Sequence, residues 1–438
     1  MKVAVVGAGW AGCAAAVEAL RLGHQVTVFE AARVAGGRAR RLELQPPSPL
    51  FVQPFSLDNG QHILIGAYTE TLRLMAELGM DTGRMFLRLP LTLLRPDGSG
   101  LSLPRLPAPA DALAGILRAG GWSLRDKLSL LRVAAAWQLG GFKCPPQQSV
   151  SELCQRLSPA VMSMLVEPLC VSALNTPPAR ASGQVFLRVI HDSLFAASGA
   201  SNLLLPRIDL SAALPDAALA WLTRRGGDVR LAARVEAMSA QPSSTGWQIG
   251  GELFDQAVLA CPPVDAARLV ERACSSSIET SKWLQRTRAL RFEAITTVYA
   301  WAGGAQLHQP MLALPSGGED LPHAAPAQFV FDRSQLGGPP GLLAFVVSAS
   351  QGDSATLTRQ VLAQGQRQLG LKALEAIKTI VEKRATFACV PGLLRPATQV
   401  APGLLACGDY VEGPYPATLE GAVRSGLQAA RQLGQASA

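Results

Sequence analysis

The stretch Lys2-Val-Ala-Val-Val-Gly7-Ala-Gly9-Trp-Ala-Gly12, followed by the alanine-rich residues 13–22, decides the fold of this 438-residue chain. Its apolar, β-branched start predicts a buried strand, and the alanine-rich segment predicts a helix. Gly7 permits a tight turn between them, Gly9 lets a pyrophosphate approach the backbone, and Gly12 lets the helix lie close to the strand. The free N–H groups at the start of this helix then face the phosphates. This strand–turn–helix unit therefore predicts a dinucleotide-binding site.

A second strand completes this unit and is followed by another glycine pair. Gln25–Phe29 predicts the strand, and Glu30 stands at its end. An acidic residue at this distance accepts hydrogen bonds from the adenosine ribose. In Gly36-Gly37-Arg38 the glycines allow a second close backbone approach, and the Arg38 guanidinium suits a phosphate. An ordinary turn with a surface arginine is the alternative reading.

The C-terminal region supplies a matching element. Gly403–Cys407 predicts a short buried strand that ends in Gly408-Asp409, and a helix is predicted to open at Thr418–Gly421. Asp409 can accept from a ribityl or ribose hydroxyl, and the N–H groups of the helix can face a phosphate or the isoalloxazine edge. NAD as the sole cofactor would leave Gly36–Arg38 and this element unexplained. The combination has the organisation of FAD enzymes of the glutathione-reductase type.

Composition narrows the function classes. Hydrophobic residues make up 48% of the chain and charged residues 16%, with a net charge of +8. There is no run of Lys or Arg, so nucleic acid is not expected as a partner, and an anionic membrane surface suits the basic, apolar chain better. The eight cysteines show no metal-ligand spacing, so no metal site is expected. With no signal peptide and no long apolar run, we expect a cytoplasmic protein resting on the inner face of the cell membrane.

These signals predict an α/β fold with a discontinuous FAD-binding Rossmann-like domain of the glutathione-reductase type. We assign residues 1–66, 200–265 and 385–438 to it. Residues 67–199 and 266–384 are assigned to an inserted α+β substrate domain, in which 106–199 form a mostly helical subdomain.

Within this subdomain, helices are predicted at Ala112–Leu117 and Leu124–Leu139, with Trp122 and Trp137 bracketing the second. Basic residues accompany them, so the region either faces a membrane or packs on the core. Elsewhere we expect a strand at Arg234–Met238 and a helix at Leu371–Lys378.

Several motifs resemble the flavin amine oxidase and phytoene desaturase superfamily over essentially the whole chain. They are Gly7–Gly12, Glu30, Gly36–Arg38, Phe254–Pro263 and Ala406–Gly426. More narrowly, three segments look like the hydroxysqualene dehydroxylases, the squalene-associated FAD-dependent desaturases of bacterial hopanoid pathways. These segments are Asp58–Tyr68, Glu167–Asn175 and Gly408–Gly421.

The resemblance implies FAD as cofactor and reductive removal of the hydroxyl of hydroxysqualene, with an unidentified electron donor. Two alternatives stay open: an oxidative relative (a carotenoid or phytoene desaturase, or an amine oxidase) and a non-catalytic isoprenoid-binding protein of the GDP-dissociation-inhibitor type. The cofactor contacts expected from the motifs and the resemblance, with Val235 meeting the adenine through its backbone, are Gly7, Ala8, Gly9, Trp10, Ala11, Gly12, Glu30, Ala31, Gly36, Gly37, Arg38, Asn59, Gly60, Gln61, Val235, Gly408, Asp409, Thr418, Leu419 and Glu420.

The proton that the departing hydroxyl needs has several candidate donors. His62 comes first, because the resemblance places its turn beside the flavin; the alternative is an imidazole that orients the flavin or binds a loop carbonyl. His191-Asp192 is a second candidate, with a solvated helix face as its alternative. Tyr410 and Tyr415 either bind the substrate oxygen or only wall the pocket. No Lys stands where it would hold a flavin-bridging water, which argues against an amine oxidase.

Overall fold

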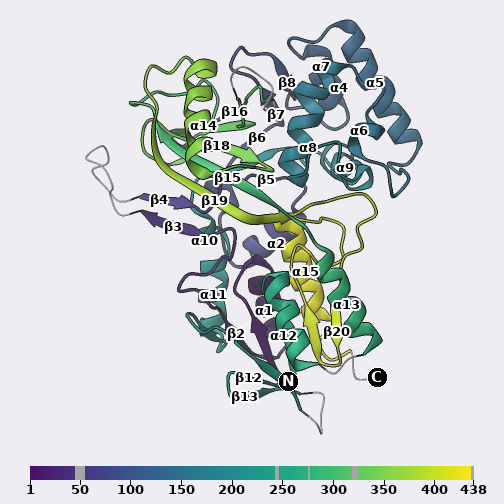
Figure 1. Ribbon diagram of the computed structural model, residues 1–438, viewed down its shortest axis with the longest axis vertical. Coiled ribbons are helices and arrows are strands. Elements are labelled where there is room, and N and C mark those ends of the chain that lie inside the picture. The colour runs from purple at the N-terminus through teal and green to yellow at the C-terminus, as the bar shows by residue number, and fades with distance from the viewer. Residues whose placement is uncertain (45–54, 242–245, 275–276, 318–323, 436–438) are drawn as a thin grey trace.

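A computed structural model of the chain describes residues 1–44, 55–241, 246–274, 277–317 and 324–435 (Figure 1). Its main sheet has the strand order β10-β2-β1-β14-β21-β20, parallel except for the β20–β21 pair. The strands are β1 Lys2–Val6, β2 Gln25–Phe29, β10 Asp228–Arg230, β14 Gln256–Leu259, β20 Gln399–Ala401 and β21 Leu404–Ala406. The first and last parts of the chain therefore share one sheet, and the expected α/β class is confirmed.

Both faces of this sheet are covered, which explains why β1 is apolar without alternation. Val3 and Val5 pack into a core with α1 (Trp10–Arg21) and α15 (Leu419–Arg431). Ala4 and Val6 belong to a second core, which includes residues of α12 (Pro263–Ala273).

Small residues let α1 lie close to its neighbours. A Cβ at Gly12 would lie 1.9 Å from the Gly7 carbonyl oxygen, and one at Gly426 would lie 2.1 Å from that of Ala11. The structural role expected for Gly12 is confirmed.

A second, antiparallel sheet has the order β16-β17-β18-β15-β19. Helix α14 (Ser354–Leu369) contacts β15 and β19, and its Leu357 and Val361 join a core on one face of the sheet. The strands are β15 Phe292–Trp301, β16 Met311–Ala313, β17 Phe329–Asp332, β18 Leu342–Ser348 and β19 Glu375–Phe387.

Smaller sheets connect the parts. They comprise β5 (Leu64–Ile65), β9 (Leu203–Pro206) and β6 (Phe86–Leu89); β3 (Arg41–Leu44) with β4 (Phe55–Asp58); β7 (Thr92–Leu94) with β8 (Gly100–Ser102); and β11 (Met238–Ala240), β12 (Trp247–Ile249) and β13 (Glu252–Phe254). The remaining helices are α2 Thr69–Glu77, α3 Thr82–Met85, α4 Ala110–Arg118, α5 Leu124–Leu139, α6 Val150–Leu153, α7 Pro159–Val161, α8 Glu167–Leu174, α9 Gly183–Ile190, α10 Leu210–Ala213, α11 Pro215–Arg224 and α13 Ile278–Ala289. Met162–Val166 and His191–Phe195 are π-helical, and Arg333–Leu336 is a 3₁₀ turn.

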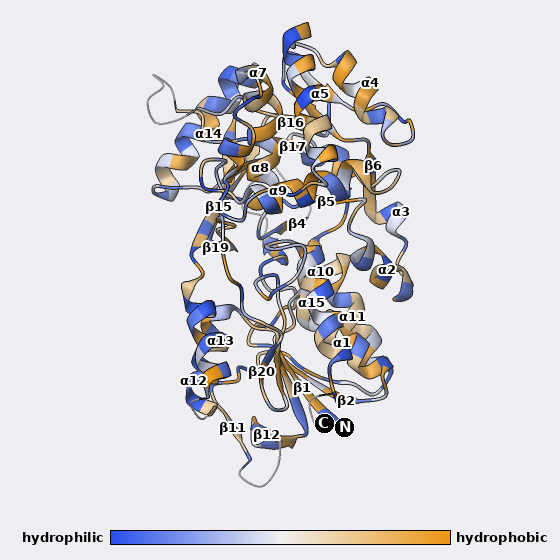
Figure 2. Cartoon of the chain, turned by 90° about the vertical axis from the view of Figure 1, so that its right-hand side faces the viewer, coloured by the Kyte–Doolittle hydropathy of each residue, from blue (hydrophilic) through white to orange (hydrophobic). Residues whose placement is uncertain are grey.

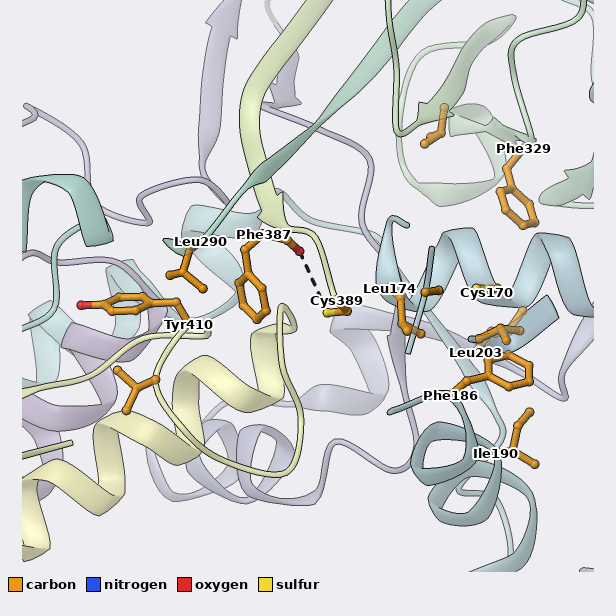
Figure 3. Close-up of a cluster of buried hydrophobic side chains, with 14 of the residues drawn as sticks. Cys170, Leu174, Phe186, Ile190, Leu203, Leu290, Phe329, Phe387, Cys389 and Tyr410 are labelled. Atoms are coloured by element: carbon orange, nitrogen blue, oxygen red, sulfur yellow. Dashed lines mark hydrogen bonds between the residues drawn. The ribbon is translucent and has the colours of Figure 1, made fainter. Parts of the chain in front are cut away.

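One buried apolar cluster joins the C-terminal loop to the helical region. Figure 3 shows Phe387 and Tyr410 at one end of the view and Leu174, Phe186 and Ile190 of α8 and α9 at the other. Among the described residues no helix is long and apolar enough to cross a membrane.

Two secondary-structure predictions are wrong. Of the expected strand Arg234–Met238, only Met238 lies in a strand, as the first residue of β11. The preceding backbone turns back to the end of β2: Ala233 N–H donates to the Glu30 carbonyl at 2.8 Å, and Ala232 has φ +54°. The segment Leu371–Lys378 is not a helix. Its second half begins β19, which pairs with β15.

The expected domain boundary at residue 266 falls inside α12. Helix α12 contacts β11, and α13 contacts β20 of the main sheet. We therefore propose that the FAD-binding domain extends through α13.

Candidate active site

A cavity of about 770 Å³ opens along the carboxyl ends of β1 and β2 and continues against the second sheet. All the expected cofactor contacts line it except Ala8, Gly12 and Glu420. The cavity therefore joins segments that lie near opposite ends of the sequence. Its volume lies within the range typical of ligand pockets.

Bare backbone forms one end of the cavity, which we call the glycine cradle (residues 7–12 and 36–37). Gly7 has φ +113°, and a Cβ there would lie 2.7 Å from the Ala260 carbonyl oxygen. Gly36 N–H donates to the Ala8 carbonyl at 2.9 Å, which brings the second glycine pair beside the first turn. A Cβ added at Gly9 would meet only the Cα of Gly37, at 3.9 Å. This floor of the cavity is therefore open to a ligand.

Glu30 stands at the edge of the glycine cradle. Its carboxylate accepts from the N–H groups of Ala8, at 2.7 Å, and Ala32, at 2.8 Å. Its place at the end of β2 matches the sequence expectation. Val235 lies buried nearby and lines the cavity, although it stands in a loop rather than in the expected strand.

Arg38 and Asp409 form an ion pair, although we expected each to bind a different part of the cofactor. Arg38 also donates to the Ala385 carbonyl of β19 at 2.7 Å. Burial alone would lower the pKa of the guanidinium, but the Asp409 carboxylate raises that pKa above its usual value. In this structure Arg38 holds the Asp409 carboxylate in place, and its expected role on a phosphate is not what its contacts indicate.

The segment Asn59–His62 crosses from the cradle to the second sheet. The Asn59 amide donates to the Glu382 carboxylate at 3.0 Å, and Gln61 N–H donates to Thr297 Oγ1 at 3.4 Å. His62 Nδ1 lies 2.6 Å from the Gly60 carbonyl oxygen, which can only accept, so Nδ1 carries the proton. Burial lowers the pKa of His62. The imidazole is therefore neutral with an accepting Nε2, and this geometry favours the structural alternative over a proton donor.

The start of α15 is arranged as the sequence predicted, except at one residue. Thr418 caps the helix, because its hydroxyl accepts from Gly421 N–H at 2.9 Å. Glu420 is fully buried away from the cavity, and its carboxylate accepts from the N–H groups of Glu70, at 3.0 Å, and Thr71, at 2.9 Å. The Glu420 side chain therefore caps α2, and the cofactor contact expected of Glu420 stays a prediction for the backbone at the start of α15.

The other proton-donor candidates differ in whether they line the cavity, although the Asp192 and Tyr415 side chains interact with each other. His191 and Asp192 do not line the cavity; they pair with each other at 2.7 Å, and Asp192 also pairs with Arg188. Tyr410 and Tyr415 both line it. Burial raises the pKa of each phenol, so both hydroxyls stay protonated at neutral pH.

The apolar end of the cavity was not predicted from single residues. Its walls come from β15–β18, the β9 strand and the π-helical turn after α9, and include Leu91, Leu169, Ile190, Leu194, Leu203, Phe292, Ile295, Phe329, Phe331 and Val346. The strand periodicity of the second sheet was visible in the sequence, but which face would meet the cavity was not.

Asn175 is a further residue without an assigned role. It adopts φ +45° at the end of α8, donates to Thr386 Oγ1 at 3.0 Å and accepts from Ala349 N–H at 2.7 Å. It stands at the end of the motif Glu167–Asn175, and its place at a helix end was the available signal.

Comparison with known proteins agrees with this geometry. Residues 10–434 match the flavin containing amine oxidoreductase family. The chain belongs to this family. It is an FAD-dependent oxidoreductase, and FAD is its cofactor.

Among similar members, the hydroxysqualene dehydroxylase of Rhodopseudomonas palustris is 28% identical over 98% of this chain and 97% of its own. That of Sinorhizobium fredii is 26% identical over the same shares. A solved oxidoreductase from Methanosarcina mazei has a TM-score of 0.73 at 16% identity, covering 99% of this chain and all of its own, and supports the fold.

Two features of this family member suit a flavin dinucleotide. The glycine cradle leaves open space at Gly9, where an added Cβ would meet only the Cα of Gly37 and would stand in that space. The Tyr410 hydroxyl is buried and has no hydrogen-bond partner among the described residues, and Tyr410 is one of the residues that line the cavity. A buried donor without a partner is costly, so a bound group that accepts from it would remove that cost.

Proposed function

We propose that this enzyme reductively dehydroxylates hydroxysqualene to squalene, as in bacterial squalene and hopanoid biosynthesis. The observation that carries the proposal is a single cavity that joins the glycine cradle to a long apolar end. The names of the two relatives that align over nearly the whole chain support the same substrate.

The apolar end suits a hydrocarbon with one hydroxyl. Its polar lining includes the neutral residues Ser172, Asn175 and Ser193. The acidic lining residues are Glu30, Asp265, Asp409 and Glu382, and the Glu382 carboxylate accepts from the Asn59 amide at 3.0 Å. The side chains that we assign to the apolar end are hydrocarbon or neutral polar groups, apart from Glu382 of the neighbouring strand β19. This favours an isoprenoid alcohol over an amine.

For the cofactor, we propose contacts with the cavity-lining members of the expected set: the backbone of the glycine cradle, Glu30, the segment Asn59–Gln61, Val235 and the ion-paired Asp409. Reduced FAD supplies a hydride when bound. Asp409 is held by Arg38, so the carboxylate is fixed in position before a ribityl or ribose hydroxyl reaches it. A separate electron donor must return the flavin to its reduced form after each turnover.

The chain must also supply a proton, because replacing C–OH by C–H consumes a hydride and a proton and releases water. We propose Tyr415 as the hydrogen-bond donor to the leaving oxygen. Its ring lies beside Arg188 of α9, whose neighbours Val189 and Ile190 line the apolar end. Its phenol stays protonated, and it is half-buried at the cavity wall, where a donor to a departing hydroxide is strengthened by the low dielectric.

The test begins with the absorption spectrum of the purified protein. Flavin bands are expected, and their absence would contradict both this proposal and an oxidative function. The reduced enzyme is then mixed anaerobically with hydroxysqualene. We expect flavin reoxidation and one squalene formed per flavin.

Each alternative gives a different result in the same experiment. Reoxidation without squalene would reject the reaction. Desaturation of phytoene or oxidation of an amine by the oxidised enzyme would favour the oxidative alternative. Isoprenoid binding by a flavin-free protein would favour the non-catalytic one.

A further inference from the structure

Helix α5 carries an exposed apolar stripe that no described part of the chain covers. Successive helical residues are about 100° apart, so Leu124, Leu128, Leu131, Ala135 and Leu139 fall within an arc of about 80° along the 16-residue helix. The exposed fractions of Leu124, Leu128 and Leu139 are 80%, 49% and 90%. A surface helix of a globular domain normally turns such a stripe inward.

The opposite face of α5 already supplies the contacts that hold the helix on the protein. Leu130 and Val133 are buried, and the Trp137 ring packs edge-on against Phe186 at 6.4 Å. Trp122 is buried and Trp137 is partly buried against the core, so the two tryptophans expected at a membrane interface pack on the protein instead. The exposed stripe is therefore a second apolar face, separate from the core.

Helix α4 extends this surface. Its Leu113 and Leu117 are exposed one turn apart, and Leu106 just before the helix is exposed too. Lys127 of α5 donates to the Leu117 carbonyl at 2.8 Å, which joins the two helices. Both helices lie at the end of the molecule opposite the N-terminus (Figures 1 and 2). The residues that we call together the α4–α5 face are Leu106, Leu113, Leu117, Leu124, Leu128 and Leu139.

The charges around this face are almost all positive. Arg118, Arg125 and Arg132 are exposed, and none forms an ion pair with a described residue. The two acids of these helices are engaged locally: Asp126 accepts from Ser123 in a capping box, and Asp111 is buried. Exposed leucines flanked by unpaired cations match the interfacial region of an anionic bilayer, where acyl chains and phosphates lie side by side.

We propose that the α4–α5 face docks this enzyme on an anionic lipid membrane. The face also lies near the apolar end of the cavity. Helix α4 contacts β8, β8 pairs with β7 through Leu101 and Leu93, and Leu93 lines the cavity. Docking at this face would bring the cavity close to a lipid substrate in the membrane, and this advantage rests on the proposed function. Membrane docking itself does not rest on it.

The test is cosedimentation of the flavin-loaded protein with vesicles of phosphatidylcholine alone or with phosphatidylglycerol added. We expect binding to the anionic vesicles that weakens as salt is raised. The triple variant Leu124→Ser, Leu128→Ser, Leu139→Ser should bind at least about tenfold more weakly, because each serine removes apolar area from the lipid contact. The matched control, Leu253→Ser, Ile278→Ser, Leu394→Ser, changes similarly exposed residues elsewhere and should bind like the parent.

The electrostatic contribution is tested with Arg118→Gln, Arg125→Gln, Arg132→Gln. Each lost cation should weaken binding to anionic vesicles about fivefold at low salt. All variants should keep the flavin content and melting temperature of the parent, since the changed side chains are exposed.

Three results would overturn the proposal. They are no binding to either vesicle, equal binding by the stripe variant and its control, or a dimer of the parent protein that the stripe variant dissociates. Because binding is measured without substrate, failure here leaves the proposed reaction untouched, and failure of the reaction leaves the docking result standing.

Discussion

Asp58 offers a quantitative test of how the protein holds the segment that enters the active site. It ends β4, directly before Asn59, and its side chain is only 3% exposed. Its carboxylate accepts from Leu210 N–H at 2.8 Å. Burial raises the pKa of Asp58 to about 7, against the lowering effects of that hydrogen bond and of Arg333.

The sign and size of the effect follow from proton linkage. The ordinary pKa of this carboxyl is near 3.8, so the folded protein binds its proton more tightly than the unfolded chain does. The stability that Asp58 contributes is therefore complete below about pH 4 and is lost as the pH rises to about 7. A difference of about 3 pKa units corresponds to about 4 kcal/mol. Asp58→Asn stays neutral and keeps an oxygen that accepts from Leu210.

We expect Asp58→Asn to match the parent near pH 4 and to be more stable by up to about 4 kcal/mol above pH 7. Urea unfolding, followed by tryptophan fluorescence between pH 4 and 8, measures this. The matched control is Asp353→Asn at the cap of α14, where hydrogen bonds from Thr356 lower the pKa of Asp353, so its pH dependence should have the opposite sign. An Asp58→Asn effect of equal size at pH 4.5 and 8, or a variant less stable at pH 8, would refute the reasoning.

Three further substitutions test the site. Tyr410→Phe removes a buried hydroxyl without a partner among the described residues, so the flavin-free protein should melt no lower than the parent. The variant should bind FAD about fivefold more weakly, because the bound cofactor loses a hydrogen bond. Thermal shift measures the melting temperature and flavin titration measures the affinity, and an unchanged FAD affinity would contradict a hydrogen bond from Tyr410 to the cofactor. Glu420→Ala breaks a buried pair with Arg424 and should cost about 3–5 kcal/mol in urea unfolding, with Glu420→Gln costing less. Tyr415→Phe should lower squalene formation by roughly 100-fold with flavin content unchanged, and an unaltered rate would reject Tyr415 as the donor.

The cofactor half of the site was readable from the sequence because it depends on local backbone. Gly7 needs a positive φ and has no space for a Cβ, and Glu30 follows the last residue of a strand whose register is set by its parallel neighbour β1. Such constraints act between residues a few positions apart, so they appear in the sequence as residue types at a fixed spacing. The same holds for Thr418, because its hydroxyl caps the helix by accepting from the N–H of Gly421, three residues later in the chain.

The side-chain contacts that the sequence did not predict involve partners far along the chain. Arg38 and Glu420 carry charges suited to a phosphate or a cofactor edge, but Arg38 meets Asp409 and Glu420 meets the start of α2. Likewise, Leu371–Lys378 has a helical pattern that is overridden where Glu375–Lys378 pair with β15. Spacing within one segment carries no information on such partners.

Strand β19 explains why the two ends of the cavity act as one site. Through Glu382 it holds the Asn59 amide, through the Ala385 carbonyl it holds Arg38, and through Thr386 it holds Asn175 at the end of α8. The same strand pairs with β15 along the apolar end of the cavity. A register shift of one residue in β19 would turn its side chains to the other face of the sheet and break these contacts. The register that positions the apolar wall therefore also positions the ion pair at Asp409, so the substrate end and the cofactor end are fixed relative to each other by one strand.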